Sequence, residues 1–119
     1  MINLYTGVIS LLKINTEFRK GIMFIRIKGS LTRENIDSIE YEDFKYVVFN
    51  LDNLLSIDSY AINYIIKYND KMLKDNGKLI ICENSNSLSG NLFKNRIPII
   101  DNEIKAFKMI WKEFYGWII

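Results

Sequence analysis

The chain has 119 residues, of which 49% are hydrophobic and 25% charged, and its 16 basic and 14 acidic side chains give a formal net charge of +2. This length and balance predict one soluble globular domain with an ordinary hydrophobic core. Because the basic residues form no block along the chain, the charge gives no sign of a nucleic-acid-binding surface.

Missing residue types exclude several kinds of chemistry. With no histidine and a single cysteine, Cys82, the chain can form no Ser-His-Asp or Cys-His catalytic arrangement, no His/Cys zinc site and no internal disulfide. We find no Gly-rich phosphate loop, no signal-peptide pattern and no apolar run of the roughly 20 residues that span a bilayer. We therefore expect a cytoplasmic protein without direct membrane insertion, in which Cys82 is a core residue. An enzyme of this composition would use carboxylates, with magnesium.

The first part of the chain predicts two strands, 8–14 and 22–28. In the second, basic residues alternate with isoleucines, which is the period of a strand with one solvated face. Residues 19–21 suit a tight connection, so the pair is expected to form an antiparallel hairpin. The polar stretch 32–41 is expected to be a loop that contains a short helix.

A buried strand and a long helix are predicted for the middle of the chain. Residues 46–51 form a continuous apolar run, typical of a strand buried on both faces, and residues 52–58 are predicted as a turn. From 59 to 76 apolar residues recur at helical spacing, and Gly77 is expected to end that helix. Its predicted apolar face consists of Ile62, Ile65, Ile66, Met72 and Leu73.

The last part of the chain predicts a buried strand at 79–82, a short helix at 87–94 and a brief strand at 97–100. Pro98 indicates either that this last strand lies at a sheet edge or that the proline stands at the end of the strand. Asp101 is predicted to be the N-cap of a final helix. Strands that alternate with helices predict an α/β fold with the helices packed on the sheet. The final helix has these residues at helical spacing: Ile104, Phe107, Ile110, Trp111 and Phe114.

The segment Asn50–Ala61, NLDNLLSIDSYA, resembles the strand–loop–helix motif of the STAS domain in bacterial anti-sigma factor antagonists. Asn50-Leu51 and Ile57-Asp58-Ser59 match the family pattern, and the order of the predicted elements is similar over residues 8–112. The resemblance implies a STAS fold for residues 1–119, with a mixed sheet of about five strands and three to four helices. It also implies a non-enzymatic binding module that has no cofactor of its own.

In proteins of this family a partner kinase, often the anti-sigma factor itself, phosphorylates the serine that follows the aspartate. The resemblance implies that Ser59 is the phosphoacceptor, with Asp58 as its acidic neighbour, and that the unphosphorylated chain binds the kinase or anti-sigma factor. A phosphate would add about −1.5 to −2 charges to the docking surface and weaken the complex. The predicted partner interface consists of Asp58, Ser59, Tyr60, Ala61 and Asn63.

Three positions differ from the family pattern. Tyr60 stands where a second Ser or Thr is usual, Ala61 replaces a glycine, and Thr32 stands where many members have an aspartate. A bulky residue after the serine is similar to the scaffold-type STAS proteins of stress-signalling complexes, and another branch of the family binds the ATPase of a lipid-transport ABC system. The alternative partners are therefore STAS paralogues or an ABC ATPase.

Several residues of the chain have two alternative interpretations. Asp58 and Ser59 are both preferred N-cap residues, and Asp52 and Asp58 form either a magnesium pair or ordinary turn and cap positions. The apolar tail 116–119 either folds back on the domain or forms a homodimer contact. Three tyrosines at every fourth position form either an edge of the core or an aromatic partner surface: Tyr60, Tyr64 and Tyr68.

Overall fold

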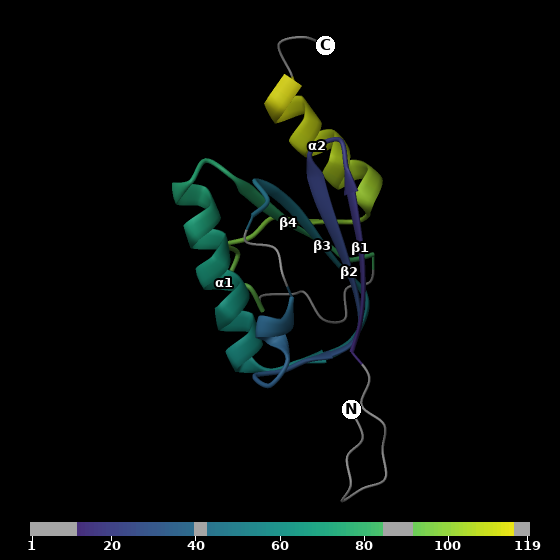
Figure 1. Ribbon diagram of the computed structural model, residues 1–119, viewed down its shortest axis with the longest axis vertical. Helices are drawn as coiled ribbons and strands as arrows, with labels where there is room; N and C mark the ends of the chain where they lie inside the picture. The colour runs from purple at the N-terminus through teal and green to yellow at the C-terminus, as the bar shows by residue number, and fades with distance from the viewer. Residues whose placement is uncertain (1–11, 40–42, 85–91, 116–119) are drawn as a thin grey trace, which may run out of the picture.

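The computed structural model describes residues 12–39, 43–84 and 92–115. Within them the chain forms one five-stranded sheet in the order β1-β2-β3-β4-β5 (Figure 1). The β1–β2 pair is antiparallel and the other three pairs are parallel, so the sheet is mixed, as predicted. The strands are β1 (Lys13–Arg19), β2 (Ile22–Leu31), β3 (Tyr46–Ile57), β4 (Lys78–Cys82) and β5 (Ile99–Ile100).

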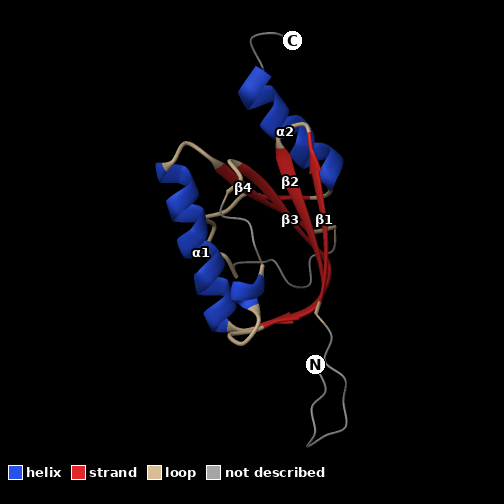
Figure 2. Cartoon of the chain, in the orientation of Figure 1, coloured by secondary structure: helices blue, strands red, loops and turns tan. Residues whose placement is uncertain are grey.

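Two α-helices and one short 3-10 helix complete the described structure (Figure 2). The 3-10 helix η1 (Ile36–Ser38) is the short helix expected after β2, while α1 (Ser59–Lys74) and α2 (Glu103–Tyr115) are the two long helices. We expected three to four helices, one of them at 87–94. Most of that segment lies outside the described residues, and Leu92–Asn95 form turns.

The predicted hairpin is confirmed. Its two turn residues, Lys20 and Gly21, have φ angles of +50° and +82°, and left-handed conformations at both positions match the twist of the strands they join. The first strand is displaced from the prediction, because β1 begins at Lys13 and the predicted strand 8–14 lies mostly outside the described residues. β1 is polar and largely exposed at the sheet edge, so its sequence has little of the alternation that reveals a strand.

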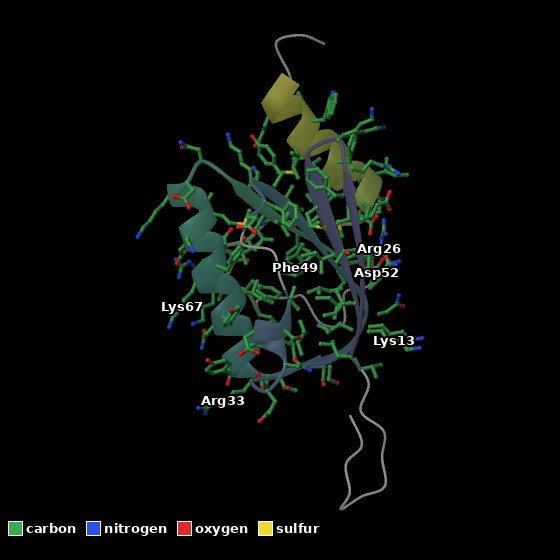
Figure 3. All side chains as sticks on the ribbon, in the orientation of Figure 1. Lys13, Arg26, Arg33, Phe49, Asp52 and Lys67 are labelled. Carbon is green, nitrogen blue, oxygen red and sulfur yellow. The ribbon has the colours of Figure 1, made fainter. Side chains whose placement is uncertain are left out.

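The two faces of the sheet bury different apolar side chains. α1 covers one face, where Phe49 lies between the helix and the sheet (Figure 3). α2 packs on the other face against Phe24 and Val48 of the central strands, with Ala106 and Ile110 buried in the contact. The predicted core residue Cys82 is fully buried on this face, and its burial raises the pKa of the thiol to about 12.

α2 differs in detail from the prediction. Asn102 is its N-cap, because its Oδ1 accepts a hydrogen bond from the Lys105 backbone N–H at 2.9 Å, whereas the carboxylate of Asp101 binds the Lys105 ammonium at 2.7 Å. Ile104 is on the solvent side and 68% exposed, as is Leu73 of α1 at 55%. Each lies at the edge of the apolar face of its helix, and helical spacing alone does not show where that face ends. The side chain of Phe114 lies outside the described residues.

β3 is longer than predicted. The expected turn at 52–58 is wrong for most of its length, because the strand continues to Ile57 and stays paired with β2. Two register shifts allow this. Asn50 lies opposite Arg26 and Asn53 opposite Lys28, so β3 contains one residue more than β2 over this interval. Such bulges change the direction of the side chains that follow them, and the polar residues here stay in the strand because it remains paired with β2.

The end of α1 also differs from the prediction. The helix ends at Lys74, and Asn76 rather than Gly77 takes the left-handed conformation, with φ +61°. The Gly77 N–H donates to the Met72 carbonyl at 2.7 Å, which satisfies an otherwise free helix carbonyl. Gly77 is required for space, since a Cβ there would lie 2.5 Å from the backbone oxygen of Lys45.

A charged network fastens the start of α2 to the sheet. Arg26 makes two 2.8 Å hydrogen bonds to the Glu103 carboxylate, and Asn50 donates a third to the same group. Arg26 also binds Glu17 and Asn15 of β1, both at 2.9 Å. The bonds from Arg26 hold the pKa of the Glu103 carboxyl below its ordinary value of 4.5, against the opposing effect of its partial burial.

Gly77→Ala is expected to destabilise the fold by about 1–3 kcal/mol, the usual effect of forcing a methyl group into a packed site. Asn76→Gly is the matched variant one residue earlier, and it should leave stability unchanged or raise it, because glycine adopts positive φ without strain. Urea unfolding measures both changes. A Gly77→Ala protein as stable as the wild type would contradict the close approach to Lys45.

The Arg26–Glu103 network is expected to make α2 docking sensitive to acid. Because the folded-state pKa of Glu103 is depressed, its contribution to stability is complete above the unfolded pKa, about 4.3 to 4.5, and is lost as the pH falls through the folded value. Urea unfolding should show Glu103→Gln less stable than wild type at pH 7, with a smaller difference at pH 3. Glu34→Gln, at an exposed position, controls for the charge change alone. An equal Glu103→Gln deficit at both pH values would contradict the prediction.

Candidate functional site

Asp58 joins the start of α1 to the segment that follows β2. It is the N-cap of the helix, and its Oδ1 accepts a hydrogen bond from the Ala61 N–H at 2.8 Å. Its Oδ2 accepts one from the Arg33 N–H at 2.9 Å. Both carboxylate oxygens are therefore used to satisfy backbone donors that would otherwise be free at a helix start and a turn. The cap interpretation of Asp58 is confirmed.

The loop beside the helix start is also held by hydrogen bonds. The Asp58 N–H donates to the Leu31 carbonyl at 3.0 Å, so the strand ends remain adjacent. Asn35 accepts a bond from the Thr32 N–H at 2.8 Å and donates to the Ser30 carbonyl at 2.9 Å, which closes a tight turn. This turn fixes the backbone of Arg33 next to the amino end of α1.

Ser59 is the first residue of α1, and its side chain is exposed. Within the described part of the chain its hydroxyl makes no hydrogen bond, so the helix cap belongs to Asp58 and leaves the serine free. The hydroxyl therefore lies on the surface beside the unpaired N–H groups of a helix start. Asp58 is occupied as an acceptor of two N–H groups, which does not suit it to act as a general base.

The predicted interface residues occupy different depths. Tyr60 is 48% exposed, and the guanidinium of Arg33 lies over its ring at 5.2 Å, the geometry of a cation–π contact. Asn63 is exposed one turn further along α1, whereas Ala61 is fully buried in the core beneath the surface. Figure 3 places Arg33 at the amino end of α1. Sequence reasoning missed Arg33, because its contact with Tyr60 joins residues far apart in the chain.

Leu55 is a second residue that sequence reasoning missed. It lies at the second register shift of β3, between Leu54, which is opposite Gly29, and Ser56, which is opposite Ser30. Its side chain is 77% exposed, the highest value among the large hydrophobic residues described. An exposed leucine a few residues before Ser59 adds apolar area to the same end of the molecule.

The other candidate residues have structural roles. Asp52 accepts a hydrogen bond from the Asn84 N–H at 2.7 Å, and in the described residues no cluster of acidic or cysteine side chains is arranged to hold a metal ion. Tyr68 is buried in the core and Tyr64 packs against it, so only Tyr60 of the tyrosine row is exposed. The tail 116–119 lies outside the described residues. No helix in the described part of the chain is long and apolar enough to cross a membrane.

Comparison with known proteins agrees with the fold described above. A family model of the STAS domain matches residues 13–94. The anti-sigma factor antagonist SpoIIAA in its unphosphorylated form is similar, with a TM-score of 0.69 and 14% identity over 84% of this chain and 97% of that chain. An anti-sigma factor antagonist from Mycobacterium paratuberculosis gives 0.69 at 11% identity, covering 84% and 94%. The Bacillus cell fate determinant SpoIIAA in its phosphorylated form gives 0.63 at 13% identity, covering 82% and 99%. Identities this low show the shared fold alone.

Asp58→Ala is expected to destabilise the protein by about 1–2 kcal/mol, because the Ala61 and Arg33 N–H groups lose their acceptor. Asp58→Asn keeps one oxygen for the cap and should lose less, since asparagine is also a good N-cap residue. Urea unfolding followed by circular dichroism measures the change. Equal stability of Asp58→Ala and wild type would show that this carboxylate does not hold the loop to the helix.

Proposed function

Because the chain belongs to the STAS domain family, we propose that it is a non-enzymatic protein-binding module controlled by phosphorylation of Ser59. In this proposal the unphosphorylated chain binds a serine kinase that also acts as an anti-sigma factor, in the cytoplasm. The docking surface consists of Asp58, Ser59, Tyr60 and Asn63, with Arg33 and Leu55 beside them and Ala61 in the core underneath.

The observation that carries the proposal is the free, exposed Ser59 hydroxyl at the start of α1, next to a cap that does not use it. A kinase can approach such a hydroxyl without unfolding the helix. The surroundings suit protein binding, since Tyr60 is half-exposed and Leu55 is largely exposed. Tyrosine and arginine are enriched in protein interfaces, and a pre-formed surface loses little entropy on binding.

Phosphorylation would act on this surface by local charge. The phosphate would be tolerated by the fold, because a helix start favours negative charge. It would nevertheless place about −1.5 to −2 charges among side chains that a partner must desolvate. The complex would weaken while the domain stays folded, which is how a small charge change is converted into release of a partner.

A second candidate function is a permanent subunit that binds STAS paralogues or an ABC ATPase, with a homodimer as its simplest form. The observation in its favour is Tyr60, which directly follows Ser59 and makes a cation–π contact with Arg33. The Arg33 guanidinium lies 5.2 Å from the centroid of the Tyr60 ring. A bulky, positioned aromatic side chain suits an interface that stays assembled. Binding in that case would not depend on the charge at Ser59.

A pull-down from lysate of the native organism distinguishes these functions. Wild type and Ser59→Ala are expected to retain a kinase-like ATPase, and Ser59→Asp is expected to lose it, because the added carboxylate imitates part of the phosphate charge. Mass spectrometry identifies the retained proteins. Ser59→Ala is the matched control, since it removes the hydroxyl without adding charge.

Equal retention of the same partner by all three proteins would contradict the switch. If that partner were a STAS paralogue or an ABC ATPase, the second function would replace the first. Circular dichroism of Ser59→Asp should match that of wild type, because aspartate is favourable in the first turn of a helix.

A further inference from the structure

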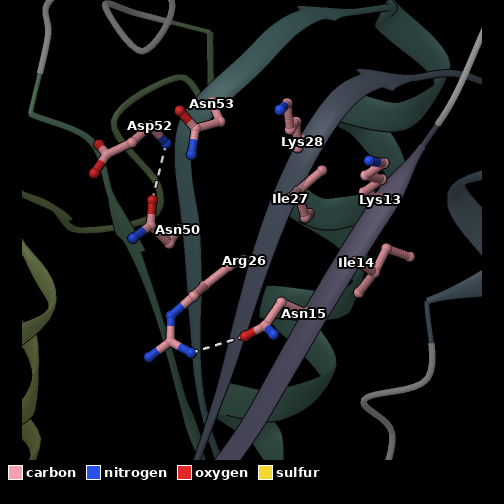
Figure 4. A pocket seen from close by; sticks show the side chains of 9 residues that line it. All are labelled: Lys13, Ile14, Asn15, Arg26, Ile27, Lys28, Asn50, Asp52 and Asn53. Carbon is pink, nitrogen blue, oxygen red and sulfur yellow. Dashed lines mark hydrogen bonds between the residues drawn. The ribbon is translucent and has the colours of Figure 1, made fainter.

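On the face of the sheet that α2 packs against, a groove lined mostly by polar residues crosses the part that α2 leaves uncovered. Its volume is about 600 Å³, within the range of small-molecule sites, and β1, β2 and β3 line it. α2 packs on the first halves of β2 and β3, against Phe24 and Val48, and further along the strands the side chains of this face become polar. Figure 4 shows the groove and the nine residues that line it.

One row of side chains across the groove is saturated with hydrogen bonds. Asn15, Arg26 and Asn50 lie opposite one another on the three strands. Arg26 binds Asn15, Glu17 and Glu103, while Asn50 donates to Glu103 and accepts from the Asp52 N–H at 2.9 Å. This row has its partners within the protein, and two carboxylates already neutralise its one cationic group.

Among the described residues, the side chains of the next row across the same strands make no hydrogen bonds. Lys13 lies opposite Lys28, and Lys28 lies opposite Asn53, so two lysines and an asparagine are cross-strand neighbours that line the groove (Figure 4). Within the described residues, none of these three side chains makes a hydrogen bond or an ion pair. Like charges directly opposite each other on a sheet are unfavourable. Asn53 shares this face with the lysines because of the bulge in β3. The row thus presents donors and positive charge without an acceptor.

We propose that the Lys13–Lys28–Asn53 row binds the phosphate group of a small phosphate monoester. A doubly charged phosphate matches two ammonium groups and offers acceptor oxygens to them and to the Asn53 amide. The rest of the ligand lies along the saturated row. Asp52, the one acidic residue among those that line the groove, accepts a bond from the Asn84 N–H and is turned away from the lysines (Figure 4). This inference is independent of the function proposed for Ser59.

The test is an NMR titration of the ¹⁵N-labelled full chain with glycerol 3-phosphate and with inorganic phosphate, at constant ionic strength set by sodium chloride. Saturable shifts are expected at the backbone amides of β1, β2 and β3 around the unpaired row. Lys28→Gln should lower the affinity by about tenfold or more, the effect of losing one charge-assisted bond. Lys67→Gln, at an exposed lysine on the outer side of α1, should leave the affinity unchanged (Figure 3).

A thermal-melting series provides a second readout. Without phosphate, Lys28→Gln should melt at the same temperature as wild type or higher, because it removes one of two like charges at paired positions of β1 and β2. With phosphate, the melting temperature of wild type should rise more than that of Lys28→Gln. The proposal is overturned if no saturable shifts occur, if sodium chloride alone reproduces them, or if Lys28→Gln binds phosphate as wild type does. Saturable binding of polyglutamate in the absence of phosphate-monoester binding would also overturn it, in favour of an acidic protein partner.

Discussion

The parallel pairing of β2 with β3 is the constraint on which the rest of the structure depends. These are the two longest strands, with 10 and 12 residues, and both helices pack against them, one on each face. The pairing survives two register shifts. The first turns Asn53 toward Lys28, and the second leaves Leu55 exposed and brings Ile57 opposite Leu31. The docking surface around Ser59 and the groove with the lysine row therefore both depend on the same strand pair, because each register shift changes which side chains share a face.

The two surfaces differ in what their charges already do. At the amino end of α1, the carboxylate of Asp58 accepts two backbone N–H groups. The exposed groups beside it are the Ser59 hydroxyl and half-exposed Tyr60, whose ring lies under the Arg33 guanidinium. That composition suits contact with another protein, which a phosphate would disturb. In the groove, the ammonium groups of Lys13 and Lys28 have no anionic partner among the described residues. In the functions that we propose, the first surface would gain a negative charge to release a partner, whereas the second would bind an anion between its two lysines.

The sequence predicted most of the central architecture. The apolar run of β3, the hairpin turn and the helical period of α1 all appear where strong local patterns place them, and the resemblance located Ser59 at a helix start. The extension of β3 was not predictable, because residues 52–56 look like a turn and stay in the strand only through pairing with β2. Arg33 and the lysine row were missed for the same reason: each depends on contacts between distant segments, such as the hydrogen bond from Arg33 to Asp58, that no local pattern encodes.

In the function that we propose, phosphate on Ser59 and partner binding exclude each other. The most direct measurement is the phosphate occupancy of Ser59 in protein recovered from the native organism, determined by mass spectrometry separately for the partner-bound and free fractions. We expect phosphoserine in the free fraction and unmodified Ser59 in the bound fraction. Equal occupancy in both fractions, or no phosphate on Ser59 in either, would contradict it.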